Sequence, residues 1–192
     1  MTEIAGYTYG RALPTSPVTT GDLDLLLATV LWSDSDAALL RRAGEILDPQ
    51  VEAVLDLWYG YVGSHPHLVA SFNGPDGTPS GPYLAAVRAR FGQWIRDLCG
   101  RAWDQQWLDY QHEIARRHTD LMGRTDDVGA AQTHIPLRYL IGFIWPITAT
   151  VRDFLAAGAT DTDDVEGMHA AWFKAVTLTV ALWSQPYDPT RW

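Results

Sequence analysis

The sequence predicts an all-α fold. Over most of the 192 residues, apolar side chains recur at intervals of three and four, as they do on the buried face of an amphipathic helix. No segment sustains the alternation of apolar and polar residues that a half-buried strand requires. Glycine and proline clusters divide the chain into seven or eight helical segments, and no internal repeat is found. A single helical domain is therefore expected.

The ends of these segments carry recognisable signals. Residues 1–20 are expected to form an extended arm, because their prolines block a helix. Thr20 can cap the first helix, and Asp48-Pro49 supplies a cap and a first-turn proline for the third. The clearest loop is Asn73–Pro82, and Pro146 is expected to kink a very apolar helix. The apolar stripes of the expected helices lie at residues 23–30, 39–47, 51–62, 84–98, 107–118, 137–151 and 165–180.

Composition excludes several classes of protein. The net charge of -9 argues against nucleic-acid and anionic-membrane partners, which need clustered Lys and Arg. The longest apolar run, residues 137–151, contains Arg138 and Pro146 and is shorter than the roughly 20 residues of a membrane span. The single cysteine, Cys99, permits no internal disulfide and fits a reducing compartment. We expect a soluble, cytoplasmic protein.

His118 is the most informative residue for function. At helical spacing Trp107, Gln111, Ile114 and His118 share one face, so the imidazole is expected to point inward. An inward neutral imidazole is a ready metal ligand, although a core histidine bonded to a carbonyl gives the same pattern. No two of the six histidines have the i, i+3 or i, i+4 spacing of a paired metal site, so a dedicated zinc site is not expected.

Other kinds of chemistry find little support. The carboxylates are spread over helix starts and loops, where they suit capping better than paired acid and base catalysis. The glycines of Asn73–Pro82 follow no strand and precede no Gly-Lys-Ser/Thr, so a phosphate loop is rejected. No serine triad is evident. Cys99 lies in an apolar helix, which raises a thiol pKa and disfavours a nucleophile.

One inward histidine among several helices suits haem. Nine tryptophans, eight tyrosines and five phenylalanines can supply the walls that a flat aromatic cofactor needs, and Trp58-Tyr59 forms an aromatic pair on another helix. His118 would be the proximal ligand of the iron. Its other ring nitrogen could donate to the carbonyl of Ile114 and fix the tautomer.

Seven segments strengthen this hypothesis. They are Gly6-Tyr-Thr-Tyr-Gly10, Leu57-Trp-Tyr-Gly-Tyr-Val62, Gly63-Ser-His-Pro-His-Leu68, Trp107-Leu-Asp-Tyr-Gln111, Pro146-Ile-Thr-Ala-Thr150, Ala171-Trp-Phe-Lys174 and Ala181-Leu-Trp-Ser184. In sequence and order the chain resembles the protoglobins, the single-domain relatives of globin-coupled sensors. The resemblance extends from about Gly6 to Tyr187 without a large gap.

The resemblance implies a globin-like fold with an N-terminal extension and an extra N-terminal helix. Residues 1–20 would form the arm, and residues 21–192 a single domain around haem b, iron protoporphyrin IX. His118 matches the proximal iron ligand, and Tyr59 matches the donor of a hydrogen bond to bound dioxygen. Trp58, Tyr59 and Phe91 would form the distal ligand site. The residues expected to contact the haem are Trp58, Tyr59, Val87, Phe91, Ile114, Phe143 and Ile147.

The sequence departs from the family pattern beside the iron ligand. A basic stretch, often with a second histidine, follows the proximal histidine in the family, whereas this chain reads Thr119-Asp-Leu-Met-Gly123. The groups that meet the haem propionates are therefore open, with Arg88 and Arg90 as candidates.

Three classes of function remain. The first is a haem protein that reversibly binds O2, CO or NO as a sensor, scavenger or carrier. The second is a haem enzyme that acts on NO or peroxide with an external electron donor, and whether the protein is an enzyme is left open. The third is a helical interaction module without haem.

Partners follow from the same resemblance. It implies a homodimer through the last two long helices. A sensor would need a signalling partner, and an NO-converting enzyme a reductase, because neither an output domain nor a reductase domain is recognised in the sequence.

Overall fold

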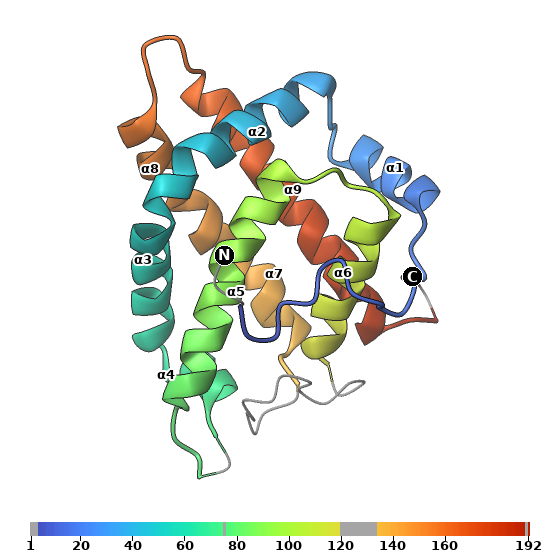
Figure 1. Cartoon of the computed structure of the whole chain (residues 1–192), viewed down its shortest axis with the longest axis vertical. Helices are drawn as coiled ribbons and strands as arrows, with labels where there is room; N and C mark the ends of the chain where they lie inside the picture. The colour runs from blue at the N-terminus through green and yellow to red at the C-terminus, as the bar shows by residue number, and fades with distance from the viewer. Residues whose placement is uncertain (1–3, 75, 120–133, 191) are drawn as a thin grey trace.

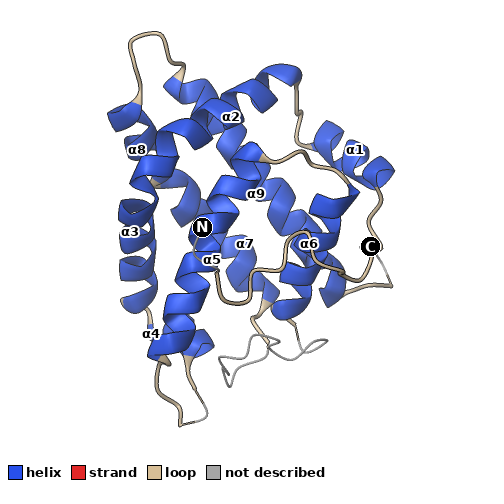
Figure 2. Cartoon of the chain, in the orientation of Figure 1, coloured by secondary structure: helices blue, strands red, loops and turns tan. Residues whose placement is uncertain are grey.

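All regular elements in the structure are helices. The structure, a computed structural model, describes residues 4–74, 76–119, 134–190 and 192, and within them only the isolated bridge between Asn73 and Pro79 involves extended backbone pairing (Figure 2). The predicted all-α class is confirmed. The α-helices are α1 (Thr20–Thr29), α2 (Asp34–Leu47), α3 (Val51–Gly63), α4 (Pro66–Val69), α5 (Gly81–Gly100), α6 (Gln105–Arg117), α7 (Leu137–Ala149), α8 (Val151–Gly158) and α9 (Val165–Ser184). The 3-10 turns are η1 (Asp48–Gln50), η2 (Ala70–Phe72) and η3 (Gln185–Tyr187).

Helix α9 organises the packing. It contacts α2, α6, α7 and α8, while α5 contacts α2 and α3 (Figure 1). Helices α2 and α5 approach closely because α2 carries Gly44, where a Cβ would lie 2.4 Å from Cys99 Cβ. Burial at this crossing raises the pKa of the Cys99 thiol to about 12, in agreement with a structural role.

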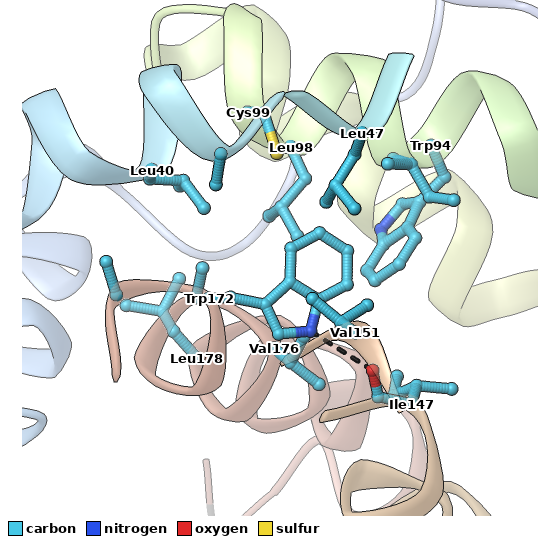
Figure 3. Packing of buried hydrophobic residues seen from close by; sticks show 14 of the residues in the cluster. Leu40, Leu47, Trp94, Leu98, Cys99, Ile147, Val151, Trp172, Val176 and Leu178 are labelled. Carbon is cyan, nitrogen blue, oxygen red and sulfur yellow. Dashed lines mark hydrogen bonds between the residues drawn. The ribbon is translucent and has the colours of Figure 1, made fainter. Parts of the chain in front are cut away.

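The core surrounds Trp172 on α9. Its indole is fully buried and donates from Nε1 to the carbonyl of Ile147 on α7, with the two atoms 3.2 Å apart. Leu98 and Val151 lie beside the ring (Figure 3). The Trp172 indole is surrounded by apolar groups and its N–H is hydrogen-bonded, so it has no unsatisfied polar atom. This part of the core therefore offers no polar group of Trp172 to a ligand.

Carboxylates and hydroxyls cap the helices, as the sequence predicts. Ser33 and Asp36 form a capping box on α2, and Asp104 and Asp164 accept from the first turns of α6 and α9. The prediction that Thr20 caps α1 is wrong by one residue. Thr19 is the cap, because Asp22 stands three residues after it and completes its capping box.

The structure contains more helices than expected within the described residues. The segment expected only to break α3 forms the single turn α4. The helix that carries Pro146 divides at Thr150, whose hydroxyl donates to the Pro146 carbonyl at 2.7 Å and competes with the backbone ladder.

Helices α7 and α8 together form an apolar segment. Residues 137–158 are long and apolar enough, by length and composition, to cross a membrane, and 22% of an 18-residue stretch within them is buried. The sequence analysis predicted a shorter apolar run, residues 137–151, because it treated Arg138 and Pro146 as interruptions. Within the fold, both helices pack against α9, and α8 also packs against α2.

The described part of the N-terminal arm lies against α5 and α6 and contains no helix before α1 (Figure 1). The rings of Tyr7 and Tyr9 contact that of Tyr110 on α6. Further along, the amide of Ser16 donates to Asp109 at 2.8 Å. These contacts bring the arm beside one cavity.

Candidate functional site

A cavity of about 250 Å³ opens between α3, α5, α6, α7 and the end of α9. This volume is close to the lower end of the range for small-molecule pockets, roughly 300 to 1,000 Å³. Aromatic and aliphatic side chains make up most of its wall. The lining residues are Trp58, Tyr59, Val62, Leu68, Ser71, Phe72, Tyr83, Val87, Arg90, Phe91, Trp94, Tyr110, Ile114, Arg117, His118, Ile135, Tyr139, Leu140, Phe143 and Trp183.

The predicted site residues largely meet in this cavity. Those that line it are Trp58, Tyr59, Val87, Phe91, Ile114, His118 and Phe143. Ile147 is not among the lining residues. It lies in the core, and its carbonyl accepts from Trp172. The expected haem contact of Ile147 is therefore not part of the observed wall, because the turn of α7 that carries it faces α9.

His118 occupies the C-cap of α6 rather than a position inside the helix. Its amide donates to Ala115 O at 3.0 Å, and its carbonyl accepts from the Ile135 amide at 2.8 Å and the Tyr187 hydroxyl at 3.2 Å. The end of α6 is thereby tied to the segment before α7 and to η3.

The imidazole of His118 is held by α9. The His118 and Trp183 ring centroids are 5.0 Å apart, and Trp183 Nε1 donates to Gln111 Oε1 at 3.0 Å. Gln111 thus fixes the indole that packs against the histidine. The Nδ1 atom of His118 is buried. The hydrogen bond that the second ring nitrogen of His118 is expected to donate to the Ile114 carbonyl stays a prediction.

Trp58 and Tyr59 on α3 supply a different wall, and they differ in their polar atoms. Trp58 Nε1 donates to Thr150 Oγ1 at 2.7 Å, and the Trp58 ring contacts that of Phe91 at 4.9 Å between centroids. The Tyr59 hydroxyl makes no hydrogen bond within the part of the chain that the structure describes. Burial raises the pKa of Tyr59, so the phenol keeps its proton and remains a donor at neutral pH.

Two cationic side chains line the cavity. Arg117 donates to Glu113 Oε1 at 2.8 Å and to the carbonyl of Gly6 at 2.7 Å, while Arg90 donates to the carbonyl of Ala5 at 3.2 Å. The N-terminal arm therefore binds both arginines. Arg88, the other propionate candidate, does not line the cavity and forms ion pairs of 2.8 Å with Glu52 and Asp56 on α3.

Sequence reasoning missed several lining residues. Arg117, in the last turn of α6, directly precedes His118, so its proximity to the predicted iron ligand was a usable signal. Trp183 lies 65 positions after His118, and periodicity alone could not bring the two rings together. The segment after Thr119 that departs from the family pattern lies outside the described residues.

These residues fit haem. No group of three or more His, Cys, Asp or Glu that could hold a metal ion occurs within the described residues, so the donor set does not suit a bare ion. One imidazole among apolar aromatic walls suits an iron whose other ligands come from a macrocycle. His118 would hold the iron, and Arg90 and Arg117, which line the same cavity, would be the candidates to meet the two carboxylates of the cofactor.

Comparisons with known proteins agree with this geometry. The Protoglobin family model matches residues 19–191. Among solved structures, the globin domain of the Geobacter sulfurreducens globin-coupled sensor is similar, with a TM-score of 0.66 and 16% identity over 86% of this chain and 97% of that domain. At this identity the likeness shows the fold alone. A search of curated proteins found no match. Because the family model covers nearly all of the chain from Thr19 onward, the protein belongs to the protoglobin family and is a globin-type haem protein.

Proposed function

We propose that the protein binds haem b through His118 and reversibly binds O2, CO and NO in the adjoining cavity, as a gas sensor, scavenger or carrier. The observation that carries this proposal is the pairing of two groups on one apolar cavity. One is the imidazole of His118, whose Nδ1 atom is buried, and the other is the half-buried phenol of Tyr59, whose hydroxyl makes no hydrogen bond within the described residues.

When bound, the haem iron would supply an open coordination position for a diatomic gas. The chain's own residues would hold the cofactor, bind the gas and exclude water. His118 would hold the cofactor, and the Tyr59 hydroxyl would donate a hydrogen bond to a gas molecule in the cavity. Trp58 would contribute only its ring, because its N–H is already bonded to Thr150. Phe91 and Phe143 would keep water away from the site.

Absorption spectroscopy tests this proposal. The protein is expressed with a haem precursor, purified, reduced and exposed to CO. We expect a Soret band that shifts with CO in the parent and is lost or altered in His118→Ala. A parent protein without a Soret band would overturn the proposal and favour the interaction module.

We also propose a homodimer formed by α7 and α9. Both helices expose large apolar side chains, with Ile141 and Trp145 on α7 at 55% and 72% exposure and Phe173 on α9 at 46%. Exposed apolar groups of this size favour a protein interface. Sedimentation velocity should show a dimer in the parent and a monomer in Trp145→Glu, whereas Leu25→Glu on α1 should leave the mass unchanged. A monomeric parent would contradict the proposal.

A cytoplasmic location is part of the same proposal, because the lone cysteine suits a reducing compartment. Cell fractionation with a periplasmic and a membrane marker would test it.

A further inference from the structure

Three tyrosines form a continuous contact from the cavity to the outer side of the N-terminal arm. Tyr110 lines the cavity and is buried. Tyr7 and Tyr9 are half-buried in the arm. Their ring centroids lie 5.4 and 5.5 Å from that of Tyr110, and both pairs are edge-on. No other part of the arm brings an oxidisable side chain to Tyr110 within the described residues.

The three phenols differ in their surroundings. The Tyr7 hydroxyl donates to Asp97 Oδ2 at 2.6 Å, whereas the Tyr110 hydroxyl makes no hydrogen bond in the described part of the chain. The guanidinium of Arg101 lies 3.7 Å from the centroid of the Tyr9 ring. Burial and the hydrogen bond to Asp97 raise the pKa of Tyr7 to about 12, so this phenol is protonated before any reaction.

These surroundings decide which tyrosine is oxidised most easily. A tyrosine that loses an electron becomes a strong acid, and the oxidised form is stable only if the phenolic proton has an acceptor. Asp97 is such an acceptor for Tyr7. It is itself buried and held by Arg101 Nε at 2.7 Å, so the proton would stay beside the phenol. Arg101 contacts both tyrosines, because it donates to the Tyr7 hydroxyl at 3.1 Å and also lies over the Tyr9 ring, so its charge does not separate them. The carboxylate of Asp97 as proton acceptor is what distinguishes Tyr7.

We propose that Tyr110 and Tyr7 form an electron relay between the cavity and the surface, which lets the protein reduce peroxide with a small one-electron donor. This proposal rests on the proposed binding of haem in the cavity. Tyr110 would pass an electron to the cofactor and take one from Tyr7 before losing its own proton, because its hydroxyl makes no hydrogen bond to an acceptor within the described residues. The oxidised state would therefore rest on Tyr7, beside Asp97. Tyr7 would be the site where the external donor reacts.

The electrons and protons balance as follows. Each hydrogen peroxide takes up two electrons and two protons and yields two water molecules. For each electron, Tyr7 loses one electron through Tyr110 and transfers its phenolic proton to Asp97. A donor such as ascorbate then returns an electron to Tyr7, and Asp97 returns the proton. Two donor molecules are oxidised per peroxide, and the two protons come from the donors or the solvent.

Phenylalanine variants separate this role from a structural one, because they keep the rings and remove only the hydroxyls. Tyr110→Phe is the sharpest variant, since its hydroxyl makes no hydrogen bond that could be lost within the described residues. Tyr7→Phe removes the hydroxyl at the outer end of the relay, and Asp97 keeps its ion pair with Arg101. Tyr61→Phe, on an exposed tyrosine of α3 outside the cavity lining, is the matched control.

The test is electron paramagnetic resonance of the haem-loaded protein, frozen shortly after mixing with hydrogen peroxide. CO difference spectra of each variant are recorded first. We expect a tyrosyl radical in the parent and in Tyr61→Phe that ascorbate removes. The signal should be lost in Tyr7→Phe, and its rapid formation should be lost in Tyr110→Phe. Ring-deuterated tyrosine should narrow the parent signal.

The outcomes distinguish this inference from the function on which it rests. A parent without haem or CO binding would overturn the proposed function. Haem-loaded variants that all bind CO, with a radical that persists in Tyr7→Phe or forms at the parent rate in Tyr110→Phe, would overturn the relay alone.

Discussion

The core around Trp172 and the cavity beside His118 are built from the same kinds of residue but end in different states. In the core, the Trp172 indole is fully buried and its N–H is bonded to Ile147 (Figure 3). In the cavity, aromatic walls enclose about 250 Å³ of space, and the hydroxyl of Tyr59 makes no hydrogen bond within the described residues. Aromatic content therefore does not distinguish a packed core from a binding site. The cavity differs from the core in having unfilled volume beside a polar group without a hydrogen bond.

The largest effect on stability is expected in the core. Trp172→Ala should lower the free energy of unfolding by about 3 to 5 kcal/mol, because it leaves a closed void among apolar side chains. Phe143→Ala in the cavity wall should cost less, because its side chain is half-buried and already borders empty space. Urea denaturation of the haem-free proteins measures both. Equal losses at the two positions would refute the distinction between a filled core and an unfilled site.

A smaller effect is expected from the ion pair between Asp36 on α2 and Lys174 on α9, which we call the clamp. Lys174 Nζ lies 2.9 Å from Asp36 Oδ2. Burial alone would raise the pKa of Asp36, but hydrogen bonds from Ser33 and Lys174 outweigh burial and lower it. A carboxyl with a lowered pKa stabilises the fold above its unfolded pKa of about 3.9 and loses that contribution as the pH falls.

Asp36→Asn should therefore cost about 2 kcal/mol at pH 7, and the deficit should shrink as the pH falls below about 4. Urea denaturation at neutral and acidic pH measures this difference. Because the clamp lies outside the cavity lining, CO binding should be unchanged. A deficit that stays constant with pH would show that the charge of Asp36 does not contribute.

The smallest change is expected from Tyr59→Phe, and it should concern the ligand rather than the fold. If the phenol donates to bound O2, its removal should speed O2 release by an amount corresponding to about 1 to 2 kcal/mol. The stability of the haem-free protein should hardly change, because no hydrogen bond in the described residues is lost. Flash photolysis measures the release, and an unchanged rate would exclude Tyr59 as the donor.

The sequence predicted the helices better than the details of the site. Amphipathic stripes identified the long helices, since burial of an apolar face depends on local spacing. The family resemblance brought Trp58, Tyr59 and Phe91 to the cavity. Neither source placed Trp183 against His118 or tied Arg117 to the arm, because these contacts join distant segments. The haem contact of Ile147 stays a prediction, but the residue does not line the cavity because its turn faces α9, which only tertiary packing decides.

The most direct test of the central proposal is chemical rescue at His118. The parent, His118→Gly and His112→Gly are loaded with haem, and their reduced and CO spectra are recorded with and without imidazole. His112 is on the same helix but outside the cavity lining. We expect the Soret band to be lost or altered in His118→Gly, restored by imidazole, and unchanged in His112→Gly. A His118→Gly spectrum identical to that of the parent would contradict His118 as the ligand of the iron.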